Sequence, residues 1–102
     1  MLEIRPNCEC CDTDLAPGST EAMICSYECT FCKRCVDDIL ENVCPNCGGG
    51  FTLRPIRPKV ARRPGLSIDH QPASTKRIHT TYGASELKEF ARSTRHIKPE
   101  HR

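Results

Sequence analysis

Cysteine is the residue type here that is best suited to chemistry, and eight of the nine cysteines form closely spaced pairs. In chain order the eight are Cys8, Cys11, Cys25, Cys29, Cys32, Cys35, Cys44 and Cys47. Zn²⁺ takes four ligands in a tetrahedron, and sites made only of sulfur are structural and have no open position for a substrate. Eight paired thiols therefore predict two zinc ions, each on four cysteines, with Cys10 as a spare thiol.

The same cysteines would suit a disulfide framework in a secreted protein. Segment 1–6 contains Glu3 and Arg5 but no apolar run, so it does not resemble a secretory signal. No other stretch approaches the length of a membrane span. Thiols stay reduced in the cytoplasm, where they serve more often as metal ligands. We therefore expect a cytoplasmic zinc protein with no membrane partner.

Residues 1–54 form the expected metal module, because all nine cysteines precede residue 48. A segment of roughly 50 residues buries too little surface to fold on a core alone, and structural zinc contributes about 10 kcal/mol or more. Short strands are expected in 22–27 and 51–53. A helix of about two turns is expected over 35–43, ended by Pro45. The predicted fold class is a small metal-stabilised α+β domain.

Residues 55–102 form the second expected region, a basic, proline-rich linker and tail. Segments 54–58 and 62–65 place prolines beside cations, which favours extended, solvated chain. We therefore expect a mostly disordered tail, with one possible short helix at 85–92 that has Ser85 as its N-cap. The first region has four basic and nine acidic residues, a net −5, and the second has eleven and four, a net +7.

Spacing alone does not decide which cysteines share a metal. Sequential wiring would place the first four ligands on one ion and the last four on the other. Interleaved wiring would give one site from Cys8, Cys11, Cys32 and Cys35, and another from Cys25, Cys29, Cys44 and Cys47. Cys29 and Cys32 are separated by two residues only, so they could also share one metal.

The ligand spacing resembles that of the RING finger of ubiquitin ligases. Phe31 before the fifth ligand, Val36 after the sixth, and Pro45 between the last two ligands also match that family. Cys29 stands where many RING fingers have histidine, so the chain would be an all-cysteine variant. The resemblance implies interleaved wiring in a RING-like, treble-clef-type double zinc finger.

A closer resemblance covers most of the first half. The segments 5–11, 22–25, 28–32, 44–49 and 54–58 are similar to a family of short bacterial cysteine-rich proteins of unknown function. The resemblance implies a bacterial, cytoplasmic, zinc-binding protein, and it brings no activity with it. It does not extend beyond about Pro64.

Three functions fit this sequence. The first is a zinc-stabilised interaction module, an adaptor for a protein partner. The second is a RING-type recruiter of a ubiquitin-conjugating enzyme. In RING fingers the docking surface uses an apolar residue of the first knuckle, an apolar helix residue, the proline of the last knuckle and a basic residue after the last ligand. Here Ile39 or Leu40 and Pro45 fit, whereas Glu9 and Gly48 do not.

The third function is nucleic-acid binding through the tail. Its cations could neutralise phosphates; they are Arg57, Lys59, Arg62, Arg63, Lys76 and Arg77. Tyr82 and Phe90 are the only aromatics available there for stacking, and the acidic first half would repel phosphate. The four histidines lie in the tail without metal-like spacing, and no catalytic serine or carboxylate pair stands beside them. We expect a binding protein and not an enzyme.

Overall fold

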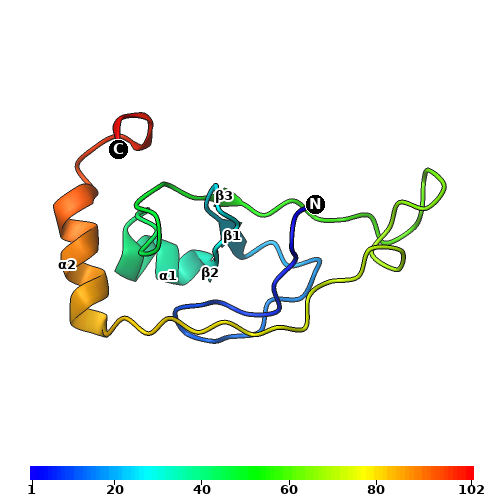
Figure 1. Cartoon of the computed structure of the whole chain (residues 1–102), viewed down its shortest axis with the longest axis horizontal. Coiled ribbons are helices and arrows are strands. Elements are labelled where there is room, and N and C mark those ends of the chain that lie inside the picture. Colours follow the sequence, from blue (N-terminus) through cyan, green and yellow to red (C-terminus); the bar gives the residue numbers. More distant parts are fainter.

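The computed structural model describes all residues 1–102 and shows a small α+β fold with short strands (Figure 1). The elements are β1 (Ala22–Ile24), β2 (Thr30–Cys32), α1 (Lys33–Cys35), a π-helical turn η1 (Val36–Leu40), β3 (Thr52–Leu53), α2 (Ala84–Thr94) and a final 3₁₀ turn η2 (Pro99–His101). None of the helices has the length and apolar character needed to cross a membrane.

The sheet has three strands in the order β2-β1-β3, and both pairings are antiparallel. Met23 at the centre of β1 is opposite Phe31 of β2 and Leu53 of β3. Strands expected over 22–27 and 51–53 are therefore present, though β1 and β3 are shorter than expected. The sheet places Cys25 just after β1 and Cys32 at the end of β2, next to α1.

The first helix begins and ends earlier than the sequence pattern predicts. The helical stretch covers Lys33 to Leu40, whereas residues 35–43 were expected. Glu41 and Asn42 have left-handed backbones, with φ of 49° and 62°, and this reversal ends the helix at Leu40, five residues before Pro45. Asn42 fits the reversal because this residue type tolerates positive φ, and its side-chain oxygen accepts a hydrogen bond from the Phe51 N–H.

The core lies between the sheet and the first helix. The rings of Phe31 and Phe51 meet edge to face, with centroids 5.3 Å apart and planes at 72°. Leu15, Val36 and Leu40 are also buried there, together with most of the cysteines. Few large side chains are present, so the thiols form a substantial part of the interior.

Residues 58–72 form a largely exposed loop that projects from the molecule, and the tail from residue 74 onward lies against the metal module (Figure 1). The expectation of a mostly disordered tail is wrong. The N–H groups of Ser74 and Thr80 donate to the carbonyls of Ile4 and Glu9, at 2.9 and 2.7 Å. Asn7 donates its side-chain N–H to the Ile78 carbonyl at 2.8 Å. Residues 74–80 thus run beside the N-terminal segment (Figure 1). Proline–cation composition signals poor burial, but it contains no information on such long-range backbone bonds.

Helix α2 extends the predicted helix of 85–92 to Ala84–Thr94. Its N-cap is Gly83 and not Ser85, and the Glu86 carboxylate accepts the Gly83 N–H at 3.2 Å. Leu87 and Ala91 are 5% and 1% exposed, and the helix packs against η1. Docking on the module therefore stabilises a helix that would be marginal in isolation.

Candidate metal centres

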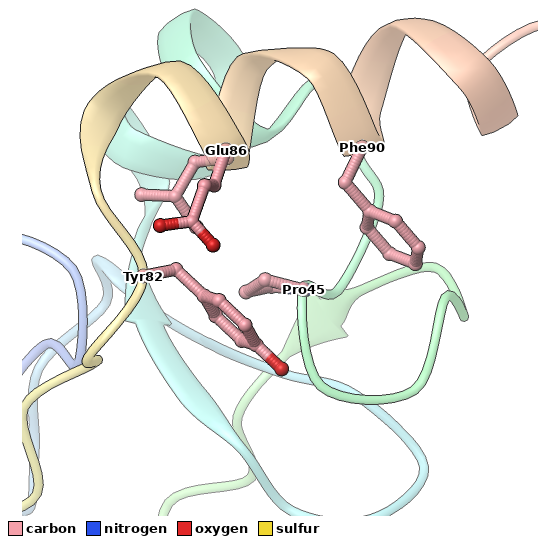
Figure 2. A pocket seen from close by; sticks show the side chains of 5 residues that line it. Pro45, Tyr82, Glu86 and Phe90 are labelled. Atoms are coloured by element: carbon pink, nitrogen blue, oxygen red, sulfur yellow. The ribbon is translucent and has the colours of Figure 1, made fainter.

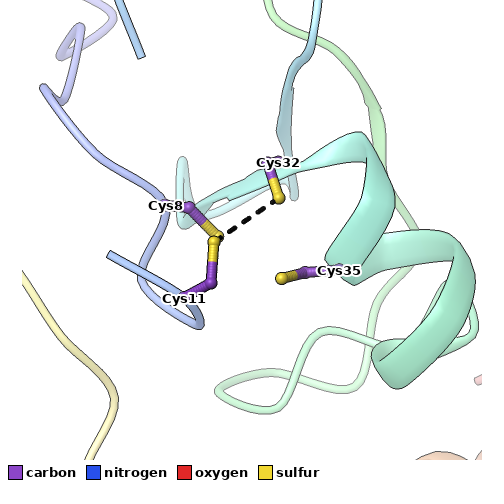
Figure 3. Close-up of side chains that lie close together, drawn as sticks. All are labelled: Cys8, Cys11, Cys32 and Cys35. Atoms are coloured by element: carbon purple, nitrogen blue, oxygen red, sulfur yellow. Dashed lines mark hydrogen bonds between the residues drawn. The ribbon is translucent and has the colours of Figure 1, made fainter. Parts of the chain in front are cut away.

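The first cysteine cluster contains four thiols. The sulfurs of Cys8, Cys11, Cys32 and Cys35 all lie within 4.8 Å of one another (Figure 3). The Sγ atoms of Cys11 and Cys32 are 3.8 Å apart. A tetrahedral zinc site with Zn–S bonds of about 2.3 Å has sulfurs about 3.8 Å apart. The cluster therefore has a suitable size and ligand set for a tetrahedral metal ion.

A tight turn and the start of a helix position these four thiols. The backbone carbonyl of Cys8 accepts a hydrogen bond from the Asp12 N–H, with 2.9 Å between nitrogen and oxygen. Asp12 has a left-handed backbone with φ of 63°. This turn brings Cys11 back towards Cys8. Cys32 ends β2, and Cys35 lies one helical turn further, on the same side of the chain. The two pairs therefore approach the same point from two separate segments.

The second cluster contains three thiols within 4.8 Å of one another, those of Cys25, Cys44 and Cys47. The Cys44 carbonyl accepts the Gly48 N–H at 2.7 Å, and Gly48 has φ of 80°. Glycine adopts this conformation without steric cost. The amide of Gly49 then donates to the Cys47 sulfur at 3.4 Å, which orients that thiol.

Cys29 and Cys10 lie beside the two clusters. Cys29 was predicted as the fourth ligand of the second site, and its sulfur is not within the 4.8 Å set. Cys29 is nevertheless buried, and burial and the Cys25 thiol raise its pKa. Cys10, predicted as the spare thiol, is half-buried and is not one of the four cysteines of the first cluster.

The clusters follow the interleaved grouping and not the sequential one. Cys8 and Cys11 share a cluster with Cys32 and Cys35, while Cys25 lies with the last pair. Two cysteine clusters could therefore hold two metal ions, in agreement with the number of sites that the sequence predicts. A donor set made only of soft sulfur ligands is typical of zinc and of iron–sulfur centres.

Burial changes the pKa values of several of these thiols when no metal is bound. Burial raises the pKa of Cys8 to about 11 and also raises the pKa of Cys35 and Cys44. For Cys11, burial alone would raise the pKa. Hydrogen bonds from the Thr13 N–H and from neighbouring thiols have the larger effect, so the pKa of Cys11 is lowered. Cys8, Cys35 and Cys44 are therefore protonated near neutral pH when no metal is bound, and a bound cation must displace their protons.

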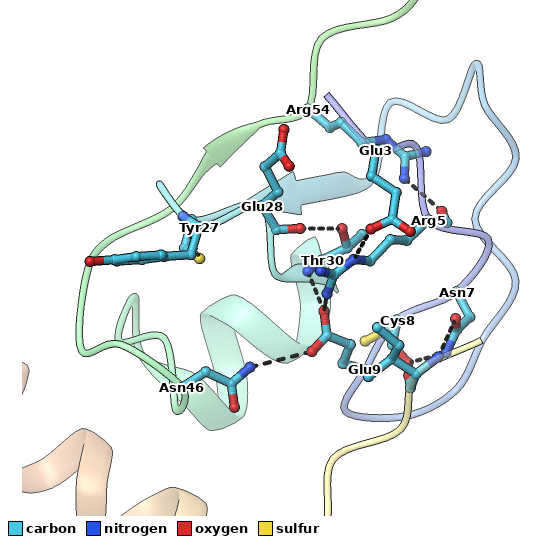
Figure 4. Close-up of polar contacts among 12 residues, drawn as sticks. Glu3, Arg5, Asn7, Cys8, Glu9, Tyr27, Glu28, Thr30, Asn46 and Arg54 are labelled. Atoms are coloured by element: carbon cyan, nitrogen blue, oxygen red, sulfur yellow. Dashed lines mark hydrogen bonds and ion pairs between the residues drawn. The ribbon is translucent and has the colours of Figure 1, made fainter. Parts of the chain in front are cut away.

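Sequence reasoning missed a buried carboxylate that links the two clusters. Glu9 is 2% exposed although it lies in the first knuckle. One of its oxygens accepts hydrogen bonds from Arg5 at 2.7 Å and from the Thr30 N–H at 2.6 Å. The other accepts the Asn46 side-chain N–H at 3.3 Å (Figure 4). The first knuckle is Cys8–Cys11 and the second is Cys44–Cys47. Asn46 belongs to the second, so this network fixes one knuckle relative to the other.

Two other buried polar residues hold the surrounding segments. Arg54 is 3% exposed and donates to the carbonyls of Arg5 and Ala16, both at 2.9 Å. Asn7 is fully buried and donates to Ile78 and to Asp12. No sequence signal distinguishes these side chains from ordinary surface residues.

The fold and the two thiol clusters define a small cysteine-rich domain that could bind metal. The chain belongs to a family of proteins of unknown function, DUF1272, whose family model matches residues 1–57. This confirms the resemblance to cysteine-rich proteins of unknown function.

The chain is also 48% identical over 85 residues to an uncharacterised protein of Rhizobium meliloti (strain 1021), a match that covers 83% of this chain and 94% of that protein. Residues 1–64 supply at most 64 of the 85 aligned positions, so at least 21 lie beyond Pro64. The likeness to relatives therefore extends further into the tail than the sequence resemblance indicated. The comparison with solved structures gives no match.

Proposed function

We propose that this chain is a bacterial, cytoplasmic, non-enzymatic zinc module that acts as a protein–protein adaptor. Each of two Zn²⁺ ions is held by four thiolates in a RING-like, cross-braced arrangement, with Cys29 completing the second site. The observation that carries the proposal is the first cluster, whose four sulfurs lie within 4.8 Å of one another. Sulfur-only sites are structural, so the metal stabilises the fold, and the surface of that fold binds the partner.

The RING-type recruiter is the weaker alternative, because the chain covers the corresponding surface itself. Glu9, Leu40 and Pro45 are all buried. Glu9 is bonded to Arg5 and Thr30, and α2 packs over η1, which contains Leu40. A conjugating enzyme could use this surface only after α2 had left it.

Nucleic-acid binding through the tail also has less support than the sequence suggested. Arg77 pairs with Asp12 and Asp14, at 3.0 and 2.6 Å. Arg57 donates to the carbonyls of Leu2 and Gln71. Two of the six candidate cations are therefore engaged within the chain, which leaves fewer to neutralise phosphates.

Metal analysis and affinity capture test the proposed function together. The purified chain should contain two zinc ions, and a zinc content of one or none would contradict the metal assignment. The zinc-loaded chain should then retain a protein partner from the native cell after nuclease treatment, while a chelator-treated bait should not. Recovery of a conjugating enzyme would favour the RING-type role, and loss of all captured material on nuclease treatment would favour nucleic acid.

A further inference from the structure

A small hollow lies between the second cysteine knuckle and α2. Its volume is about 200 Å³, and it is lined by Pro45, Tyr82, Glu86, Leu87 and Phe90 (Figure 2). Pro45 belongs to the knuckle, Tyr82 to the segment just before α2, and the other three to α2 itself. The hollow therefore exists only because the tail docks on the metal module.

The walls of this hollow are aromatic and apolar. Tyr82 and Phe90 are 44% and 40% exposed, so their rings are open to an incoming group. In Figure 2 the Tyr82 ring lies beside Pro45, and Phe90 lies on the other side of the space. The negative face of an aromatic ring attracts cations such as ammonium and guanidinium groups.

A carboxylate without a counter-ion lies at the edge of the same hollow. One oxygen of Glu86 accepts the Gly83 N–H at 3.2 Å, and the other makes no hydrogen bond within the chain. No lysine or arginine lines the hollow, and Figure 2 shows the carboxylate pointing towards Tyr82 and Pro45. The N-terminus of α2 contributes a partial charge of roughly +0.5 nearby. The full negative charge of the Glu86 carboxylate is larger, so the net charge there is negative.

The proposed second zinc site, which includes Cys44 and Cys47, would add to this negative charge. Pro45 lies between Cys44 and Cys47 in the sequence, and four thiolates around one zinc ion have a net charge of about −2. We propose that the hollow binds a cationic side chain, lysine or arginine, of the protein partner. The inference rests on the proposed adaptor function, and it specifies the chemistry that the partner must present.

A titration followed by NMR tests the hollow directly, with the full zinc-loaded chain. The probes are N-acetyl-lysine methylamide, N-acetyl-arginine methylamide and N-acetyl-norleucine methylamide, which has an uncharged chain of similar length. We expect the two cationic probes to give saturable shifts at the amides of Tyr82, Glu86 and Phe90. The norleucine probe should bind about threefold to tenfold more weakly, because it lacks the ionic and cation–π contacts.

Two matched variants separate the role of Glu86 from general charge. Glu86→Gln keeps a carbonyl oxygen for the Gly83 N–H, so the helix cap is preserved, and it should reduce lysine-probe affinity by about threefold to tenfold. Glu89→Gln makes the same charge change on α2 at an exposed residue that does not line the hollow, and it should leave the affinity almost unchanged.

Several results would overturn the inference. Equal binding of the norleucine probe would make the hollow a purely apolar site. Tighter binding of N-acetyl-glutamate methylamide would show that the helix N-terminus controls the charge preference. Absence of saturable shifts in a sample that contains two zinc ions would reject the hollow alone. A sample that contains no zinc would instead reject the proposed function.

Discussion

At the scale of single residues, Glu9 makes the most informative set of contacts. Its carboxylate joins Arg5, the backbone of Thr30 and the side chain of Asn46. The Arg5–Glu9 pair is largely removed from water, with side-chain exposures of 16% and 3%. Breaking a buried pair leaves an uncompensated charge, so the arrangement of the two knuckles depends on this carboxylate.

Glu9→Gln should destabilise the zinc-loaded fold by about 2–3 kcal/mol, because Arg5 loses its buried ionic partner and an amide N–H₂ faces other donors. Denaturant unfolding at fixed zinc concentration measures the change. Glu3→Gln is the matched control, since Glu3 also contacts Arg5 but its side chain is 39% exposed, and it should cost less than about 1 kcal/mol. Equal losses in the two variants would show that burial of Glu9 has no special importance.

Substitution of Cys10, the predicted spare thiol, and of Cys29, the proposed fourth ligand of the second site, should have opposite effects on zinc content. Cys10→Ser should retain two zinc ions per chain, because the first cluster already contains four other sulfurs. Cys29→Ser should reduce zinc content towards one, because the second cluster has only three sulfurs without it. Elemental analysis measures both variants. Loss of zinc in Cys10→Ser would make Cys10 a ligand, and two tightly held zinc ions in Cys29→Ser would remove Cys29 from the second site.

The cysteines were predictable from the sequence, whereas the residues that link the two knuckles were not. Paired thiols at short spacing have few other uses in a reduced compartment, so the clusters could be expected. Glu9, Asn7 and Arg54 have residue types that are mostly exposed. Their burial depends on partners that are remote in sequence, such as Ile78 for Asn7, and composition cannot reveal those partners.

At the scale of elements, α2 depends on the metal module for its order. It buries Leu87 and Ala91 against η1, and Arg95 pairs with Glu41 at 2.7 Å just beyond the helix end. That ion pair is exposed, so it contributes little, and apolar packing is the main cause of docking. The existence of α2 could be predicted from spacing, but its docking site could not.

Leu87→Ala should destabilise the protein by about 2–4 kcal/mol, as removal of a buried leucine side chain does elsewhere. The loss should appear first in α2, as faster hydrogen exchange of its amides. Lys88→Ala is the control, because Lys88 is exposed on the neighbouring face. Unchanged exchange in α2 of the Leu87 variant would show that the helix is not held by this contact.

At the scale of the whole molecule, protons and metal compete for the same thiols. Burial raises the pKa of Cys8 to about 11 and raises that of Cys35 and Cys44, while free thiols in an unfolded chain titrate near pH 8.5. Below that pH both the unfolded chain and the metal-free fold hold these protons, and zinc binding releases them. Stabilisation by the proposed zinc ions should therefore be largest at alkaline pH and should be lost as the pH falls.

This competition predicts that apparent zinc affinity rises with pH between about pH 5 and pH 8. Competition with a chromophoric chelator at several pH values measures the slope. Proton release into a weakly buffered solution, on addition of zinc to the metal-free chain, provides an independent measurement. A pH-independent affinity would show that the ligands are already deprotonated without metal, contrary to the effect of burial on their pKa values.

Metal removal should unfold the tail together with the module, because the two are bonded as one structure. Residues 74–80 hydrogen-bond to residues 4–9, which include Cys8 of the first cluster. Helix α2 packs on η1, which follows Cys35 directly. In the proposed function, the two zinc ions are the main source of stability in so small a core. Under increasing chelator, the NMR signals of α2 and of Phe31 should therefore disappear at the same concentration. Added zinc should restore both, whereas calcium, which prefers oxygen ligands, should not. Persistence of α2 after the signals of the sheet are lost would show that the tail folds independently of the metal centres.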